Sequence, residues 1–92
     1  MKIVIRERAA DDLDNIHAWI AKDNPPAATE TIARISERIN LLATPGLAYM
    51  GRPGLVPSTR ELVEPPYIIV YEVHEDRNEI VVLAIIHGAQ DR

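Results

Sequence analysis

Hydrophobic residues recur every three or four positions through the first half of the chain, which is the spacing of one helical face. The first series is Ala9, Leu13, Ile16 and Ile20, and it predicts a helix over residues 8–22. The second series is Ala28, Ile32, Ile35, Ile39 and Leu42, and it predicts a second helix that ends near Thr44. Asn24 can cap this helix, and the two prolines after it suit a first turn, where an absent N–H is tolerated. Because the linker is short, the helices are expected to form an antiparallel hairpin.

Short runs of β-branched and aromatic residues, which favour strands, lie on either side of these helices. One run covers residues 3–5, and three more follow the helices, at residues 59–63, 67–73 and 79–86. A loop rich in Gly and Pro, residues 45–58, precedes these three strands, and a long ordered loop in a small domain is often functional. Residues 1–92 are therefore expected to form one α+β domain of order β-α-α-β-β-β, with the two-helix hairpin packed on an antiparallel sheet.

Several large side chains can be placed on this predicted fold. The aliphatic residues of the strands that are expected in the core are Leu62, Val70 and Leu83. Trp19 flanks the apolar stripe of the first helix and is expected at the edge of the core, since few other large aromatic residues are present to fill the centre. Tyr67 and Tyr71 are four apart on one strand, so they face the same side and are expected either to pack under the helices or to contact a partner.

The charge and composition exclude several classes of protein. Ten Lys and Arg against fourteen Asp and Glu give a net charge of −4, which argues against direct binding of nucleic-acid phosphate, because that binding relies on clustered cations. The chain has no cysteine, which excludes disulfides, thiolate metal sites and cysteine nucleophiles. The longest apolar run, residues 80–86, is too short to span a membrane, and no signal-peptide core follows Met1. A cytoplasmic protein without a membrane partner is expected.

The residue types do not indicate a metal, cofactor or hydrolase site. The three histidines, His17, His74 and His87, lack the spacing of metal ligands, and the glycines lie in the Pro-rich loop rather than between a strand and a helix. The remaining candidates are polar and aromatic residues near the long loop and the strand ends: Tyr49, Arg52, Arg60, Tyr67, His87, Gln90 and Arg92. Loops and strand ends are a usual location for a binding surface.

Two interpretations of Arg60 and His87 follow from their chemistry. A ribonuclease would use His87 as general acid or base and Arg60 to hold the phosphate. Alternatively, Arg60 pairs with a nearby carboxylate and His87 forms a hydrogen bond with a loop carbonyl. Residue types and spacing leave both interpretations open.

An ordered set of short motifs resembles the RelE/ParE toxin superfamily of bacterial type II toxin–antitoxin modules. The motifs run along nearly the whole chain: Ala9-x-x-Asp12-Leu13-x-x-Ile16, Trp19-Ile20-Ala21-x-Asp23-Asn24-Pro25, Gly51-Arg52-Pro53-Gly54, Thr59-Arg60-Glu61-Leu62, Pro66-Tyr67-Ile68-Ile69-Val70-Tyr71 and Ile85-Ile86-His87-Gly88-Ala89. Each motif alone is weak, and the closing His-Gly-Ala after an apolar strand is the most specific. The fold that the resemblance implies, β-α-α followed by a β meander, agrees with the fold predicted from the periodicity.

The resemblance implies one of two activities. RelE-like members cleave mRNA in the ribosome with basic side chains, and a nuclease of this kind would use Arg60, His87 and Arg92 here. Other cations of that set are missing, since Ile68 follows the strand tyrosine and Gln90 follows Gly88-Ala89. Each lost preorganised donor lowers the rate by a factor on the order of 10²–10³. The sequence is therefore more similar to the ParE branch.

ParE-like toxins bind DNA gyrase, block replication and arrest growth, and some stabilise plasmids. On this interpretation the chain has no catalytic residue, and the seven candidate residues above contact the target or the antitoxin. The resemblance also implies a cognate, ParD-like antitoxin with a segment that is disordered until it wraps the toxin. The sheet edge and the groove beside the helical hairpin are expected to receive it.

Overall fold

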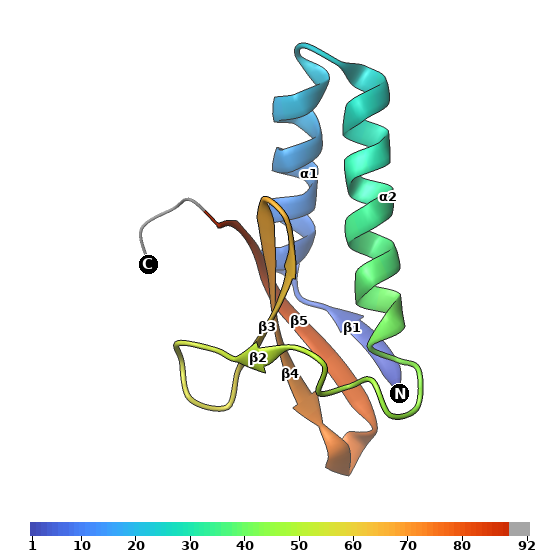
Figure 1. The fold of residues 1–92 in the computed structure, drawn as a ribbon, viewed down its shortest axis with the longest axis vertical. Helices are drawn as coiled ribbons and strands as arrows, with labels where there is room; N and C mark the ends of the chain where they lie inside the picture. Colours follow the sequence, from blue (N-terminus) through green and yellow to red (C-terminus); the bar gives the residue numbers. More distant parts are fainter. Residues whose placement is uncertain (89–92) are drawn as a thin grey trace.

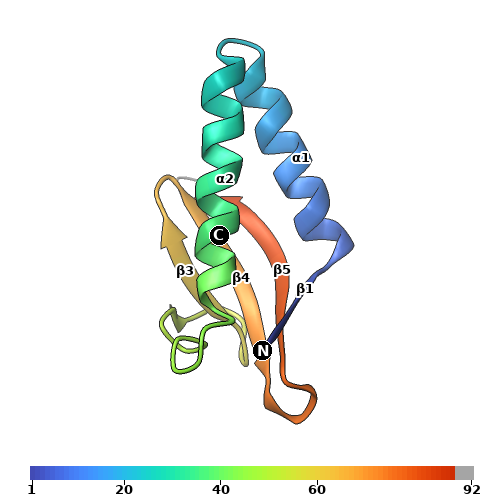
Figure 2. The ribbon, with the colours of Figure 1, turned by 90° about the vertical axis from the view of Figure 1, so that its right-hand side faces the viewer.

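The fold is described from a computed structural model, and the structure describes residues 1–88. Two helices lie on one face of a five-stranded sheet (Figures 1 and 2). The elements, in chain order, are β1 Lys2–Ile5, α1 Glu7–Ala21, α2 Pro25–Leu41, β2 Arg52–Pro53, β3 Arg60–Glu64, β4 Tyr67–His74, a 3₁₀ turn at Glu75–Arg77, and β5 Glu79–His87. None of the helices in the described chain is long and apolar enough to cross a membrane.

Both helices form where the hydrophobic spacing predicts them. The Asn24 side chain caps α2 by accepting a hydrogen bond of 3.1 Å from the Ala27 N–H, and Pro25 and Pro26 occupy the first turn. The linker between α1 and α2 is short, so the helices form the expected antiparallel hairpin (Figure 2). The hairpin extends beyond the end of the sheet, and its far end has no strand beneath it (Figures 1 and 2).

The sheet confirms the predicted α+β class and adds two features. Its strand order is β1-β5-β4-β3-β2. The meander of β3, β4 and β5 is antiparallel, whereas β1 pairs with β5 in parallel, from Lys2 opposite Glu79 to Ile5 opposite Val82. The sheet is therefore mixed. A two-residue strand, β2, adds to the outer edge of β3 from within the predicted loop.

The core lies between the helical hairpin and the sheet. Its largest fully buried side chains are Ile35 and Leu42 from the α2 region and Ile69, Tyr71, Ile80 and Val82 from the sheet. Leu62 is buried as predicted. Val70 and Leu83, in contrast to the prediction, are only partly buried. Val70 pairs with Ala84 and Glu61 on the face of the sheet away from the helices. Leu83 lies at a bulge of the sheet and has no partner in the ladder between β4 and β5.

The prediction that Trp19 lies at the edge of the core is wrong, because Trp19 is 69% exposed. It is next to Ile20 in sequence but lies on a different side of α1, since neighbouring residues on a helix point about 100° apart. It also lies in the last turn and a half of α1, toward the end of the hairpin that extends past the sheet. An indole in this position lies largely outside the core.

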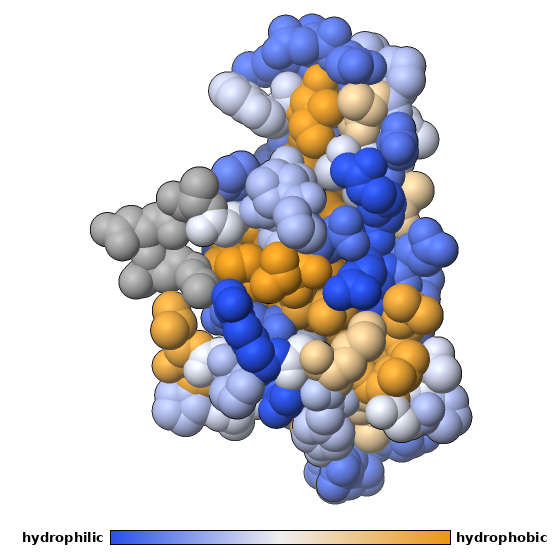
Figure 3. Space-filling model, in the orientation of Figure 1, coloured by the Kyte–Doolittle hydropathy of each residue, from blue (hydrophilic) through white to orange (hydrophobic). Residues whose placement is uncertain are grey.

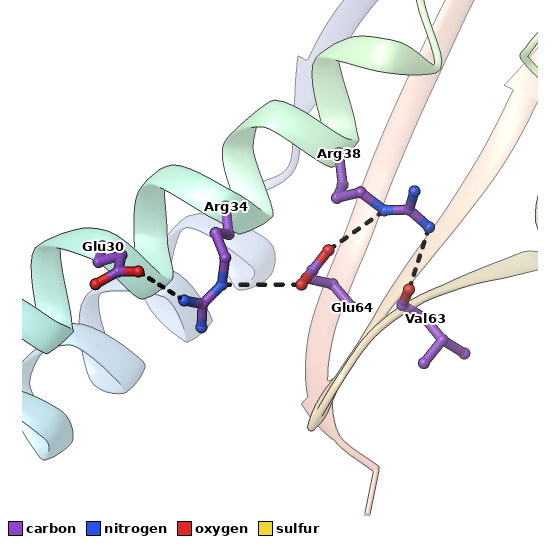
Figure 4. A network of polar contacts seen from close by, with 5 residues as sticks. All are labelled: Glu30, Arg34, Arg38, Val63 and Glu64. Carbon is purple, nitrogen blue, oxygen red and sulfur yellow. Dashed lines mark hydrogen bonds and ion pairs between the residues drawn. The ribbon is translucent and has the colours of Figure 1, made fainter.

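A charged network ties α2 to the end of β3 (Figure 4). Arg38 donates a hydrogen bond of 3.2 Å to the Val63 carbonyl and forms an ion pair of 3.4 Å with Glu64. Arg34 lies 3.9 Å from the same carboxylate and 3.3 Å from Glu30, one helical turn away. Pairs this exposed contribute little each, so the main consequence of the network is geometric: it fixes the β3–β4 hairpin against α2.

Shortening Ile35 to alanine tests the packing of α2 on the sheet. Ile35 is fully buried, so Ile35→Ala is expected to lower the free energy of unfolding by about 2–5 kcal/mol, the range for a large-to-small change in a core. Leu41→Ala is the matched control, because Leu41 lies on the same helix and is 38% exposed. Urea unfolding followed by circular dichroism measures both. Equal losses would contradict the assigned core.

Candidate functional site

The structure separates the predicted site residues into two groups. Tyr49, Arg52 and Arg60 lie around the loop that joins α2 to β3. Tyr67 and His87 face each other across β4 and β5, with ring centroids 5.5 Å apart and the planes at 83°. Gln90 and Arg92 lie outside the described residues. Tyr67 is 8% exposed and belongs to the core cluster, so most of its ring packs under the helices.

Arg60 holds the long loop through backbone carbonyl groups. Its Nη2 donates to the Tyr49 carbonyl at 2.9 Å and to the Gly51 carbonyl, and its guanidinium lies 5.3 Å from the centroid of the Tyr49 ring. Its Nε is buried and has no hydrogen-bond partner among residues 1–88. Of the two interpretations of Arg60, the geometry matches neither, because carbonyl oxygens rather than a carboxylate or an open phosphate site receive the guanidinium.

The hydroxyl of Tyr71 fixes the same loop from inside the core. It donates to the Ala48 carbonyl at 2.9 Å and accepts from the Gly51 N–H at 3.1 Å, and the Tyr71 side chain is fully buried. Gly51 is required by close approach, since a Cβ there would lie 2.7 Å from both the Glu61 carbonyl oxygen and the Tyr71 hydroxyl. One phenol thus ties two points of the loop to the sheet.

Arg52 forms an ion pair with a buried carboxylate across β2 and β3. Its Nη2 lies 3.2 Å from Glu61 Oε1, and the Glu61 side chain is only 5% exposed. A carboxylate that is this buried requires a charged partner, and Arg52, which is 56% exposed, supplies it at the rim of the sheet. Part of the Arg52 charge is therefore used inside the protein rather than offered to a ligand.

The tip of this loop exposes two aliphatic residues that the sequence reasoning missed. Leu55 and Val56 are 67% and 64% exposed, and Figure 3 shows hydrophobic surface at the outer end of the loop. The tip is closed by hydrogen bonds from the Gly54 N–H to the Thr59 carbonyl at 2.9 Å and from the Thr59 hydroxyl to the Val56 carbonyl at 2.6 Å. Two adjacent aliphatic residues within a Gly/Pro-rich loop could have indicated this exposed apolar tip from the sequence.

Two concave regions lie on opposite sides of the end of the sheet. A cleft of about 300 Å³ between α1 and the strand ends is lined by Arg8, Asp12, Asn15, Ile16, Trp19, Tyr67, Ile85, Ile86 and His87. A groove of about 360 Å³ beneath the loop tip is lined by Leu55, Val56, Thr59, Glu61, Val70 and Ile86. The first combines aromatic and charged groups, whereas the second is almost entirely apolar. No group of acidic, histidine or cysteine residues within the described chain could hold a metal ion.

Tyr49 is the residue whose acidity is most clearly altered. Its hydroxyl donates a hydrogen bond of 2.8 Å to Glu75 Oε1. This hydrogen bond is the main cause that raises the pKa of Tyr49 above its usual value, with smaller contributions from burial and from the negative charge of Glu75, while Arg60 opposes the shift. The phenol therefore stays protonated at neutral pH and acts as a donor, not as a general base.

Comparison with known proteins shows the family to which this chain belongs. The model of the ParE toxin family of the type II toxin–antitoxin system parDE matches residues 3–92. The chain is 42% identical over 85 residues to the Sinorhizobium fredii protein Y4kP, and the matched region covers 90% of this chain and 83% of that protein. The chain therefore belongs to the ParE toxin family, and it is a toxin of the type II toxin–antitoxin class within the ParE/RelE superfamily.

Solved structures agree with this assignment. A chain of the chromosomal ParDE toxin–antitoxin system of P. aeruginosa superposes with a TM-score of 0.83 at 29% identity, over 95% of both chains. The isolated RelE toxin of E. coli superposes with a TM-score of 0.69 at 10% identity, over 99% of this chain and 87% of that one. The second likeness concerns the fold alone, because so low an identity carries no information on activity.

Removing the Tyr71 hydroxyl tests the anchoring of the loop. Tyr71→Phe leaves the buried Gly51 N–H and the Ala48 carbonyl without this partner, so the free energy of unfolding is expected to fall by about 1–3 kcal/mol. Thermal and urea unfolding measure the change. Tyr49→Phe is the control, since that hydroxyl bonds an exposed carboxylate and its loss should matter much less. A similar loss in the two variants would show that Tyr71 does not anchor the loop.

The Tyr49–Glu75 pair predicts a pH effect. Glu75→Ala is expected to lower the pKa of Tyr49 toward its usual value, because the carboxylate that stabilises the protonated phenol is gone. Since the folded-state pKa is raised, the stability that the pair contributes is lost as the pH rises through that pKa. Phenolate absorbance titration measures the shift, with Tyr49→Phe identifying the Tyr49 signal and Asp76→Ala as the control. An unchanged Tyr49 titration in Glu75→Ala would contradict the assignment.

Proposed function

We propose that this toxin arrests bacterial growth by binding DNA gyrase, and that a cognate, ParD-like antitoxin neutralises it. The observation that carries the proposal is the match of the ParE family model to nearly the whole chain, supported by the likeness to the ParDE system of P. aeruginosa at 29% identity. A toxin directed at gyrase acts in the cytoplasm, which agrees with the composition.

The described residues favour a protein-binding inhibitor over a ribonuclease. A metal-independent ribonuclease needs cations free to stabilise the charge that develops on phosphate. The Arg60 guanidinium is instead directed at backbone carbonyls of its own loop, and Arg52 pairs with the buried Glu61. The net charge of −4 also disfavours docking on RNA. The RelE-like alternative, cleavage of ribosome-bound mRNA, therefore has less support and becomes an outcome of the test.

The cleft beside α1 is the proposed place for the antitoxin. Trp19 stands 69% exposed at its rim, and the floor is formed by Ile16, Tyr67 and Ile85. Exposed tryptophans next to apolar depressions are typical anchors of protein interfaces, and an amphipathic helix or extended segment fits a groove of this kind. The charged residues Arg8 and Asp12 at the cleft can select the partner by hydrogen bonds and ion pairs at the rim.

The test is ATP-dependent supercoiling of relaxed plasmid by purified bacterial gyrase, titrated with this protein. Inhibition with accumulation of linear, protein-linked DNA is the expected result, because the proposed toxin stalls gyrase on cleaved DNA. Toxin first incubated with its cognate antitoxin is the matched control and should leave supercoiling intact. Normal supercoiling by a folded, growth-inhibiting toxin would contradict the gyrase target, and cleavage of ribosome-bound mRNA would then support the RelE-like alternative.

A further inference from the structure

The sheet has two stretches of edge that no other strand covers within residues 1–88. β1 pairs with β5 only as far as Val82, so the stretch from Ala84 to Ile86 has a paired strand, β4, on one side alone. β2 pairs with β3 only at Arg60 and Glu61, so the remainder of β3 is also open on its outer side. Open edges expose backbone donors and acceptors to which a strand of another chain can add.

A charged side chain from a helix occupies the open edge of β5. Asp12 of α1 accepts a hydrogen bond of 2.9 Å through Oδ2 from the Ile85 N–H. Arg8, one turn earlier, lies 3.4 Å from the same oxygen, and the Asp12 side chain is only 20% exposed. The Arg6 N–H bonds the Val82 carbonyl at 3.0 Å immediately before α1 begins, so the helix starts where β1 leaves β5 and carries Asp12 over Ile85.

The open edge of β3 is occupied in the same way by a charge of opposite sign. Arg38 of α2 donates to the Val63 carbonyl at 3.2 Å, and Glu64 holds the guanidinium from the other side at 3.4 Å (Figure 4). An acceptor thus covers an open N–H on one edge, and a donor covers an open carbonyl on the other. Hydrogen bonds with one charged partner are stronger than neutral ones. The Asp12 contact is also partly buried, whereas the Arg38 contact is exposed, so the Asp12 contact is the harder of the two to displace.

We propose that Asp12 blocks the open edge of β5 against pairing with the β5 edge of a second copy of this chain. The segment from Leu83 to Ile86 is uninterrupted apolar sequence, and like edges can pair antiparallel about a two-fold axis, which makes a second copy the natural partner. An incoming strand must remove the Asp12 carboxylate from Ile85 and leave it desolvated beneath the new strand. That cost keeps the edge closed in the free toxin.

Replacement of Asp12 in the full-length protein tests the proposal. Asp12→Ala removes the acceptor, Asp12→Asn keeps an oxygen at the same place without the charge, and Asp14→Ala removes an exposed charge from the same helix. Sedimentation velocity over a wide range of concentration measures association. Asp12→Ala is expected to associate reversibly toward twice the monomer mass. Asp12→Asn, which has no charge to desolvate, is expected to associate more weakly than Asp12→Ala, whereas wild type and Asp14→Ala stay monomeric.

Amide exchange of Ile85 supplies a second readout at concentrations where Asp12→Ala is monomeric. Loss of the hydrogen bond to a charged acceptor should accelerate its exchange roughly tenfold. A monomeric Asp12→Ala at every concentration would overturn the proposal, whether or not Ile85 exchanges faster. Association of Asp14→Ala equal to that of Asp12→Ala would also overturn it, because the loss of any negative charge on α1 would then be sufficient. If Asp12→Ala fails to fold, Asp12→Ser, whose hydroxyl is too short to reach Ile85, takes its place.

Discussion

The short parallel pairing of β1 with β5 determines how the rest of the molecule is arranged. It ends where the Arg6 N–H bonds the Val82 carbonyl, and α1 starts at the next residue. Because the chain leaves the sheet halfway along β5, α1 must cross the uncovered half of that strand. The cleft beside α1, the exposure of Trp19 at its rim and the contact of Asp12 with Ile85 all follow from this one departure point.

Tyr71 of β4 determines the position of the loop between α2 and β3. Tyr71 is a core residue by its ring and a loop anchor by its hydroxyl, so packing and loop geometry are coupled through a single side chain. Arg60 adds a second anchor from the surface. A loop held at both points presents Leu55 and Val56 in one arrangement, which lowers the entropy that a partner must remove on binding.

Local patterns in the sequence predicted the local structure, and the errors arise where distant segments meet. Helical spacing and the Asn24 cap depend on neighbouring residues, so both helices were predicted within a few positions. The parallel direction of β1 and the bulge at Leu83 depend on pairing across the whole chain. The contacts of Arg60 were missed for the same reason, because its carbonyl partners come from a loop that periodicity does not describe. The exposure of Trp19 was missed because it depends on how far the hairpin extends past the sheet.

On the proposed function the toxin acts through the shape of its surface, so an antitoxin neutralises it by covering or overlapping that surface. Ile86 contributes to both concave regions, the cleft beside α1 and the apolar groove under the loop tip. The two regions therefore meet at the end of β5 although they open on opposite faces. An antitoxin seated in the cleft, as proposed, lies one strand thickness from the groove. A large target that covers the groove would therefore overlap an antitoxin in the cleft without any change in the toxin fold.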